Sequence, residues 1–236
     1  MIKSTIKLEN VWKIYKMGTT SVEALRGLSL EVRDGEFLSI MGPSGSGKST
    51  AVNMVGCLDI PTRGNIFLGG HNISQLSESA LAQIRGRKIG FIFQTFNLLN
   101  TMSAIENIML PMIFLNKPVN ERRERAKKLL ELVELDDRMD HKPTELSGGQ
   151  QQRVAIARAL ANDPEIILAD EPTGNLDSKT GRTVMEFLKK LNTEKNKTIV
   201  MVTHDPVLSK FADRIEYLKD GKTVNSLNNN HNNKLK

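Results

Sequence analysis

The hydrophobic and polar residues follow three different patterns along the chain. In the first part, short apolar runs alternate with glycine-containing turns, which is typical of β-strands. The sequence from Ser49 to Leu58, which ends before the breaker Pro61, predicts a helix. Strands are expected at residues 6–12, 24–32, 37–41, 64–70 and 89–93.

The middle of the chain, from about Asn97 to Pro164, has a helical period. In its clearest segment, apolar residues recur at i, i+3, i+4 and i+7, and charged residues occupy the opposite face. These apolar positions are Ala126, Leu129, Leu130 and Val133. We therefore expect an α-helical lobe inserted into an α/β core.

The last part returns to alternating strands and helices. Apolar runs at Ile166–Ala169 and Thr198–Thr203 predict buried strands, and residues 184–191 predict a helix with one apolar face. A hairpin is expected across Asp220-Gly221. From Asn225 onward the chain is polar and rich in asparagine, so we expect residues 225–236 to be a disordered tail.

The composition excludes several classes of protein. Cys57 is the only cysteine among 236 residues, which rules out an intrachain disulfide and indicates a reducing compartment. No apolar stretch has the length of a signal-peptide core or a membrane-spanning helix, so we expect no direct membrane insertion. The net charge of +6 is spread among acids, as in residues 121–125, and indicates solvated helix faces rather than a nucleic-acid surface.

A glycine-rich loop after the strand expected at 37–41 matches the phosphate-binding pattern G-x-x-x-x-G-K-[ST] at every fixed position. Its glycines let the backbone amides turn inward, and the following helix start adds unpaired N–H donors. Lys48 is expected to reach the terminal phosphates, and the Ser49 hydroxyl to coordinate Mg²⁺. The expected ligand is a magnesium-bound nucleoside triphosphate. The expected binding residues are Gly42, Ser44, Gly45, Ser46, Gly47, Lys48, Ser49 and Thr50.

Two carboxylates, Asp170 and Glu171, follow the apolar run at 166–169. Open α/β sheets bind their ligands at the carboxyl ends of the strands. We expect Asp170 to hold Mg²⁺ and Glu171 to activate an attacking water, and the alternative is an acidic cap for the next helix. His204 follows the next buried strand and is expected near the same phosphates.

Two further features also have ordinary explanations. Ser147, within the Leu-Ser-Gly-Gly-Gln sequence at 146–150, precedes a helix whose N-terminus suits an anion, but Ser-Gly-Gly is a common helix start. Tyr15 either stacks on a base or packs as an ordinary tyrosine.

Taken in chain order, these segments resemble the full motif set of the ATP-binding cassette (ABC) ATPases. The set consists of Gly42–Thr50, Gln94, Leu146–Gln150, Asp170-Glu171, Leu176-Asp177 and His204. It covers essentially the whole chain up to the tail. The sequences at 56–59, 93–98 and 106–111 are further similar to the subgroup that serves lipoprotein-release, macrolide-export and antimicrobial-peptide-resistance permeases. One departure, which concerns the fine geometry of the dimer contact, is Gly174-Asn175, where many relatives have Ser-Ala.

The resemblance implies a fold and further site residues. The fold is a P-loop NTPase core with a mixed, mainly parallel sheet, an N-terminal antiparallel β subdomain and an inserted α-helical subdomain at about 97–164, all within one ABC ATPase domain at 1–224. Tyr15 would stack on adenine, and Gln94 would sense Mg²⁺ and the attacking water. His204 would hold the γ-phosphate and orient Glu171. The nucleotide contacts from a second copy would be Ser147, Gly148, Gly149 and Gln150.

The resemblance also implies partners. Two copies would sandwich two ATP molecules head to tail and would power a separately encoded integral membrane permease at the cytoplasmic face of the cell membrane. The alternative is an ATPase that moves a signalling membrane complex without cargo. A nucleic-acid machine of the same superfamily is disfavoured, because repair types need a long coiled coil and ribosome types usually carry two cassettes.

The permease is expected to dock near Gln94. Residues 96–99 and 109–114 carry more large apolar side chains than a lobe surface normally shows, which suits a groove for a partner helix. The alternative is that these residues form the lobe's own core. On the docking hypothesis, a charge at Leu98 or Met112 uncouples the permease and leaves the subunit folded.

Overall fold

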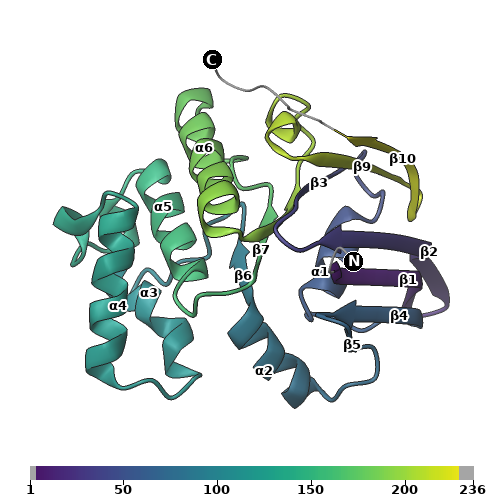
Figure 1. Cartoon of the computed structure of the whole chain (residues 1–236), viewed down its shortest axis with the longest axis horizontal. Coiled ribbons are helices and arrows are strands. Elements are labelled where there is room, and N and C mark those ends of the chain that lie inside the picture. Colours follow the sequence, from purple (N-terminus) through teal and green to yellow (C-terminus); the bar gives the residue numbers. More distant parts are fainter. Residues whose placement is uncertain (1–3, 229–236) are drawn as a thin grey trace.

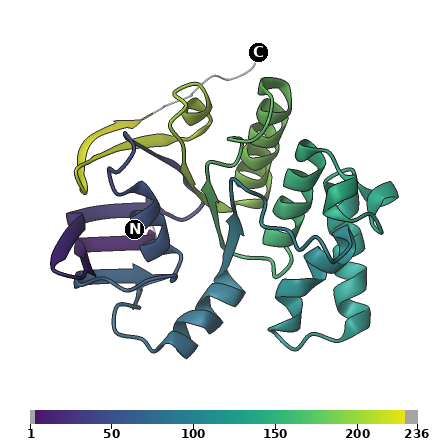
Figure 2. The ribbon, with the colours of Figure 1, turned by 180° about the vertical axis from the view of Figure 1, so that it is seen from behind.

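The computed structural model describes residues 4–228 and contains a central sheet between two lobes (Figure 1). The N-terminal antiparallel sheet lies on one side and a group of helices on the other, and the view from behind shows the same separation (Figure 2). The central sheet has six strands in the order β10-β9-β3-β8-β7-β6. The smaller sheet has four strands in the order β2-β1-β4-β5.

Buried apolar strands form the centre of the larger sheet. Its mutually parallel strands are β9 (Arg214–Lys219), β3 (Phe37–Met41), β8 (Thr198–Val202), β7 (Ile166–Asp170) and β6 (Ile89–Ile92). Every residue of β3 and β8 is buried, which explains their nearly continuous apolar sequences. Since β10 (Lys222–Asn228) pairs antiparallel with β9, the sheet is mixed and mainly parallel, as predicted.

The start of the predicted tail at Asn225 is wrong. Strand β10 continues to Asn228, and its residue Asn225 lies opposite Tyr217 of β9. The hydrogen bonds of a strand pair join backbone groups, so an edge strand needs few apolar side chains and leaves a weak signal in the sequence. The rest of the expected tail, residues 229–236, lies outside the described residues.

The N-terminal sheet contains two strands that are longer than the pattern predicts. β1 (Ser4–Met17) and β2 (Thr20–Arg33) form a long antiparallel hairpin, and β4 (Arg63–Leu68) and β5 (His71–Asn72) complete the sheet. In β2, residues 20–23 are exposed and the first buried residue is Leu25. The outer half of the hairpin buries little surface, so its sequence has no apolar period from which these strand ends could be predicted.

The helical lobe contains three α-helices inside the expected range of about 97–164. They are α3 (Ala104–Ile113), α4 (Val119–Leu132) and α5 (Gly148–Ala159), with the short turns η1 (Asp136–Arg138) and η2 (Pro143–Glu145) between the last two. The predicted apolar positions, from Ala126 to Val133, are buried in a core that the lobe shares with one face of the central sheet. This shared core fixes the lobe to the sheet.

The apolar residues at 96–99 and 109–114 divide between core and surface. Met112 is fully buried and Leu98 packs against the same core. The expectation that a charge at Met112 leaves the subunit folded is therefore wrong, because it would bury an unpaired charge. Leu99, Ile113 and Phe114 are exposed, with Phe114 exposed by 76%.

The remaining helices cover the central sheet. α1 (Lys48–Val55) shares a core with the N-terminal sheet, and α6 (Ser178–Lys195) packs into the core of the helical lobe. α2 (Glu78–Lys88) is missing from the sequence prediction, because Leu81 is its one buried residue and its apolar positions show no period. α1 ends before the predicted Leu58, since Cys57 takes a left-handed φ of 54°. The chain reaches β9 through the short turn η3 (Leu208–Phe211).

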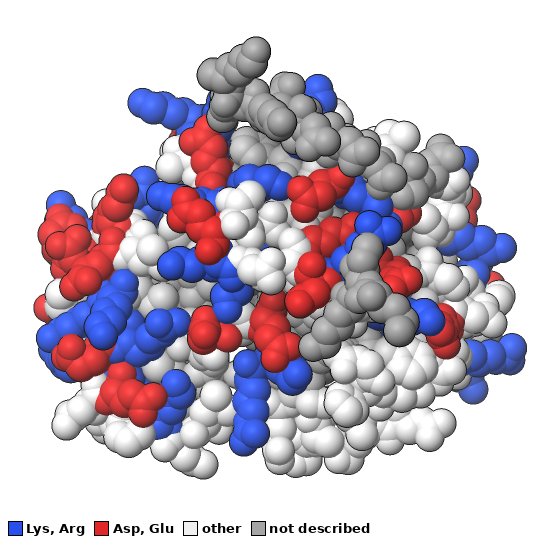
Figure 3. Space-filling model, viewed as in Figure 1, with Lys and Arg blue, Asp and Glu red and all other residues white. Residues whose placement is uncertain are grey.

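The surface carries charges of both signs. Lys and Arg are interspersed with Asp and Glu over the face drawn in Figure 3. Several of them form ion pairs between residues four positions apart, including Lys117 with Glu121 and Arg182 with Glu186. Among residues 4–228, no helix combines the length and apolar character needed to cross a membrane.

Candidate functional site

The glycine-rich loop joins β3 to α1 through contacts that only glycine allows. Gly42 and Gly47 have φ values of 153° and 98°, and a Cβ on them would lie 2.1 Å from the Leu218 carbonyl oxygen and 2.5 Å from the Ala24 carbonyl oxygen. A Cβ on Gly45 would meet nothing within 4 Å, so this glycine borders open space. Gly47 begins α1 without a side-chain cap, which leaves the first N–H groups of the helix available to an anion.

Lys48 lies over this loop. Its Nζ donates hydrogen bonds to the carbonyl oxygens of Gly42 and Pro43, both at 2.8 Å. These acceptors are neutral, so a phosphate oxygen would be a stronger partner for the ammonium group.

A cavity of about 620 Å³ brings the loop together with residues that follow three parallel strands. Gln94 follows β6, Asp170 ends β7, and His204 follows β8. The predicted site residues that line this cavity are Gly42, Ser44, Gly45, Gly47, Lys48, Ser49, Thr50, Gln94, Asp170, Glu171 and His204. Ser46 is buried and does not line it. Residues far apart in the sequence meet here because the carboxyl ends of parallel strands share one edge.

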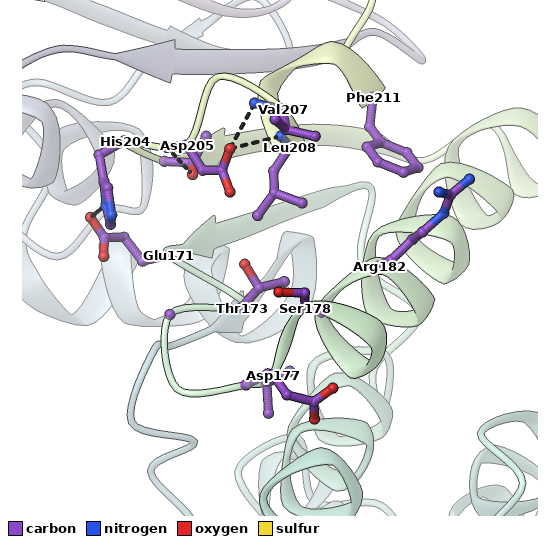
Figure 4. A pocket seen from close by; sticks show the side chains of 14 residues that line it. Glu171, Thr173, Asp177, Ser178, Arg182, His204, Asp205, Val207, Leu208 and Phe211 are labelled. Atoms are coloured by element: carbon purple, nitrogen blue, oxygen red, sulfur yellow. Dashed lines mark hydrogen bonds and ion pairs between the residues drawn. The ribbon is translucent and has the colours of Figure 1, made fainter.

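Asp170 and Glu171 are neighbours in different surroundings. Burial raises the pKa of the Asp170 carboxyl, Glu171 raises it further, and Lys48 acts in the opposite direction. Glu171 has a left-handed φ of 44°, and its N–H donates to the Val202 carbonyl oxygen at 2.9 Å. Its side chain points to His204, whose Nδ1 lies 2.9 Å from Glu171 Oε1 (Figure 4). Strained backbone of this kind is concentrated at functional sites.

Oxygen atoms suited to a divalent cation line the same cavity. They belong to the Ser49 hydroxyl, the Gln94 amide and the Asp170 carboxylate. Such hard ligands fit Mg²⁺, which also retains waters and phosphate oxygens in its shell. In the part of the chain that the structure describes, no cluster of three His, Cys, Asp or Glu residues is arranged to hold a metal. Ser49, Gln94 and Asp170 are the residues that would hold a cation here.

Tyr15, in β1, lies at the edge of this cavity rather than in its lining. Its hydroxyl donates to Asp59 Oδ2 at 2.9 Å, and Lys13 Nζ lies 5.0 Å from the ring centroid. Burial and the hydrogen bond to Asp59 raise the pKa of the Tyr15 hydroxyl. The cross-strand partner of Tyr15 is Val22, which does line the cavity. Cross-strand partners lie on the same face of a sheet, so the ring is next to the site.

The segment 146–150 lies away from the phosphate loop. Ser147 and Gln150 form a capping box at the start of α5, in which each side chain accepts a hydrogen bond from the backbone N–H of the other, at 3.3 and 2.9 Å. Gly149 packs so closely on Thr180 that a Cβ would lie 2.5 Å from Cγ2 of that residue. Ser147, Gly148, Gly149 and Gln150 do not line the cavity of their own chain.

A second cavity, of about 630 Å³, adjoins the Glu171–His204 pair (Figure 4). Its lining includes Asp177, which caps α6, and Asp205, whose Oδ1 accepts hydrogen bonds from the next turn. Sequence reasoning missed this cavity and also missed Val22, Glu23 and Ala24 in the first one. The register of β1 against β2 places Val22 opposite Tyr15 and Glu23 opposite Ile14, and the exposed sequence at 20–23 carries no apolar period that reveals it.

Comparison with known proteins identifies the family. The family model described as ABC transporter matches residues 25–174. The chain is 55% identical over 221 residues to an uncharacterized ABC transporter ATP-binding protein of Thermotoga maritima, with 94% of each chain covered. It is 48% identical over 219 residues to the macrolide export ATP-binding/permease protein MacB of Brucella melitensis, an alignment that covers 93% of this chain and 34% of MacB.

A solved structure is similar over nearly the whole chain. It is the dimeric structure of a post-hydrolysis state of the ATP-binding cassette MJ0796 bound to ADP and Pi, with a TM-score of 0.88 and 52% sequence identity over 95% of this chain and 98% of that one. MJ0796 itself is an uncharacterized ABC transporter ATP-binding protein of Methanocaldococcus jannaschii. The family match spans the phosphate loop and the Asp170-Glu171 pair that form the cavity. The chain belongs to the ABC transporter family, as a nucleotide-binding subunit that hydrolyses ATP.

Proposed function

We propose that two copies of the chain form two shared Mg²⁺-ATP sites and that ATP hydrolysis in them drives a membrane permease. The observation that carries the proposal is the separation of two phosphate-binding elements within one chain. The phosphate loop lines the first cavity, whereas Ser147–Gln150 begin a helix in the other lobe. A head-to-tail dimer would place that helix N-terminus of one copy against the nucleotide held by the other.

Each residue of the site has a proposed task. Loop residues 42–50 bind the phosphates through backbone N–H groups and the Lys48 ammonium. Glu171 accepts a proton from the attacking water, and His204, 2.9 Å from it, holds the carboxylate in place and contacts the γ-phosphate. Tyr15 stacks on the adenine. Mg²⁺, held by Ser49, Gln94 and Asp170 together with the nucleotide, supplies positive charge to the β- and γ-phosphates.

The solved relative supports the dimer. MJ0796 was solved as a dimer with ADP and Pi bound. The helix that begins with the capping box at Ser147 and the two glycines has an N-terminus suited to a phosphate. This N-terminus does not line the cavity that contains the phosphate loop of the same chain.

We infer that the permease docks between the central sheet and the helical lobe. A cavity of about 270 Å³ lies there, and the described residues that line it include no acid. Its lining contains Phe91 and Phe93, whose rings stack with centroids 5.6 Å apart, and the two cations Arg85 and Arg158. Such a groove suits an apolar helix that carries a carboxylate.

The relatives indicate the class of the partner. MacB is named as a combined ATP-binding and permease protein for macrolide export, which supports an export-type permease here. On this proposal the permease holds the chain at the cytoplasmic face of the membrane.

The experiment that tests the shared sites is a mass measurement of the Glu171→Gln chain by light scattering. Loss of the base slows hydrolysis, so bound ATP persists and stabilises the state in which two copies enclose it. We expect 26.3 kDa without nucleotide and twice that mass with Mg²⁺ and ATP. The control carries Ser147→Arg in addition and is expected to stay monomeric. An ATP-bound Glu171→Gln chain that remains monomeric would contradict the proposal.

A further inference from the structure

The turn from β7 to α6 contains Gly174-Asn175, and both residues contact Gln94. We propose that this pair positions Gln94, because Gly174 leaves space for the Gln94 side chain and Asn175 holds the Gln94 backbone. The inference rests on the role proposed above for Gln94 at the Mg²⁺-ATP site. Gly174 and Asn175 are positioning residues, since neither lines the cavity that contains the phosphate loop.

Gln94 packs directly on Gly174. A Cβ on Gly174 would lie 2.6 Å from Gln94 Nε2, 3.0 Å from Cδ and 3.1 Å from Cγ. Gly174 is not among the residues with positive φ, so its backbone conformation would accept another residue. Glycine is therefore needed here for space alone. All three atoms belong to one flexible side chain, and a larger residue would displace that side chain rather than disrupt the fold.

Asn175 fixes the backbone of the same residue. Its Nδ2 donates to the Gln94 carbonyl oxygen at 2.9 Å. Arg158 of α5 donates to the carbonyl oxygens of Phe96, at 2.8 Å, and Asn97, which both have left-handed backbone. The loop after β6 is thus held at three carbonyl oxygens, those of residues 94, 96 and 97, and Asn175 provides the contact at Gln94 itself.

The turn that carries the pair is itself held in place. The Gly174 N–H donates to the Glu171 carbonyl oxygen at 3.0 Å, and the fully buried Gln152 of α5 donates to the Pro172 carbonyl oxygen at 2.5 Å. This turn begins with Glu171, the proposed base. Contacts from Gly174 and Asn175 therefore set the position of Gln94 relative to Glu171, across the cavity that both residues line.

Replacement of Gly174-Asn175 by Ser-Ala would disturb both contacts. Serine at 174 brings a Cβ and a hydroxyl into the space of the Gln94 amide, and alanine at 175 has no donor for the Gln94 carbonyl oxygen. We expect Gly174→Ser and Asn175→Ala each to lower ATP turnover about three- to tenfold, the size of effect that one lost hydrogen bond produces. We also expect a higher Mg²⁺ concentration for half-maximal rate.

The experiment compares these variants in the full chain by Mg²⁺-dependent turnover and by melting temperature. Asn175→Asp keeps the size of the side chain without the amide donor and is expected to match Asn175→Ala. Asn72→Ala is the control, because it removes exposed asparagine hydrogen bonds far from Gln94: Asn72 Nδ2 donates to Asn65 Oδ1, and Asn72 Oδ1 accepts from the Ser74 N–H. We expect melting temperatures close to that of the parent chain for all of these variants.

A second readout needs neither activity nor metal. The side-chain amide signal of Gln94, identified by its loss in Gln94→Ala, can be followed by NMR in glutamine-labelled chain without nucleotide. Gly174→Ser should shift this signal and Asn72→Ala should not. In the Gln94→Ala background, Gly174→Ser should cause no further loss of turnover, because the displaced side chain is already absent.

The possible outcomes distinguish a failure of this inference from a failure of the role proposed for Gln94 at the Mg²⁺-ATP site. A parent chain without Mg²⁺-dependent hydrolysis overturns the proposed roles and the inference with them. With an active parent, the inference is overturned by an unshifted Gln94 signal in Gly174→Ser. The inference is also overturned if Gly174→Ser lowers ATP turnover as much in the Gln94→Ala background as in the parent chain. It is overturned as well if the variants that lose turnover also lose melting temperature to a matching degree.

Discussion

At the scale of single residues, the left-handed backbone of Glu171 gives Asp170 and Glu171 different surroundings. Asp170 is the last residue of β7, and Glu171 turns away from the strand with a φ of 44°. Burial raises the pKa of the Asp170 carboxyl and the Lys48 ammonium of the phosphate loop opposes this shift, while Glu171 pairs with the exposed His204. Two neighbouring carboxyls thereby acquire different environments, as a metal ligand and a base require.

Glu171→Gln tests the proposed base. The variant keeps the size and hydrogen bonding of the side chain but accepts a proton poorly, so hydrolysis should fall by roughly 10²-fold or more. ATP affinity measured by calorimetry should remain close to that of the parent chain. A turnover number equal to that of the parent would rule out Glu171 as the base.

Lys48→Ala tests the cation of the phosphate loop. Lys48 interacts with phosphates in the ground state and the transition state, so the variant should lose ATP affinity as well as turnover. Calorimetry measures the affinity, and Lys190→Ala, which removes an exposed lysine of α6, is the control. Equal ATP affinity of the Lys48→Ala and control chains would contradict this role.

A site residue could be predicted from the sequence where the residues that indicate it are adjacent in the chain. Gly42–Thr50 and Asp170-Glu171 could be predicted because a strand, a turn and a helix start are adjacent in the sequence. The contact of Asn175 with Gln94 could not, since it joins residues 81 positions apart. Tyr15 lies between these cases: its approach to the cavity depends on the register with Val22.

At the scale of elements, prediction succeeds where burial imposes a period. α4 buries Ala126, Leu129 and Leu130 at helical spacing and was predicted, whereas α2 buries Leu81 alone and was missed. The same reasoning explains the missed outer half of the β1–β2 hairpin, whose residues are exposed. Strand pairing and capping determine such elements, and both leave weak apolar signals.

Ser103→Ala tests the cap of α3. The Ser103 Oγ accepts from the Glu106 N–H, and Glu106 Oε2 accepts from the Ser103 N–H at 2.7 Å and from its hydroxyl at 3.0 Å. The variant should lower the free energy of unfolding by about 1 kcal/mol at pH 7, measured by urea denaturation. Ser79→Ala, at an exposed position of α2, is the control and should not destabilise the chain.

The same cap should weaken in acid. The hydrogen bonds from Ser103 hold the pKa of Glu106 below its ordinary value of 4.5. A lowered pKa in the folded state means that the carboxylate stabilises the fold above pH 4.5, and that this contribution is lost as the pH falls through the lowered value. Ser103→Ala keeps the hydrogen bond from the backbone N–H to Glu106 and removes the one from the hydroxyl, so the part of the difference due to the hydroxyl bond should be lost in acid. A difference that stays constant with pH would exclude the charged hydrogen bond as its source.

Phe114→Glu and Met112→Glu separate the docking surface from the core. Phe114 is exposed by 76% and Met112 by 0%, so only the Met112 variant should lower the melting temperature and basal ATP hydrolysis. Phe114→Glu should keep both properties and lose co-purification with the permease. If Phe114→Glu retains the permease at parental levels, the docking surface does not extend from the groove of Phe91 and Phe93 to Phe114.

At the scale of the whole molecule, the central sheet joins two cores that carry different parts of the site. One face packs with the helical lobe and α6, and the other packs with α1 and the N-terminal sheet. The phosphate loop belongs to the second side and the capping box at Ser147 to the first (Figure 1). The inserted lobe could be predicted from its helical period, and the mixed sheet from the resemblance to the ABC ATPases. The structure adds that Ser147–Gln150 do not line the cavity of their own chain, as the expected contact with the nucleotide of a second copy would require.

The most direct test of the shared sites is the ATP hydrolysis rate of a mixture of two inactive variants. Lys48→Ala removes the cation of the loop, and Ser147→Arg blocks the helix N-terminus offered to the other copy. A mixed dimer then contains one site with both defects and one site with neither. The account predicts that the mixture hydrolyses ATP well above the mean of the separate rates. A rate equal to that mean, with mixed dimers verified by light scattering or affinity tags, would contradict it.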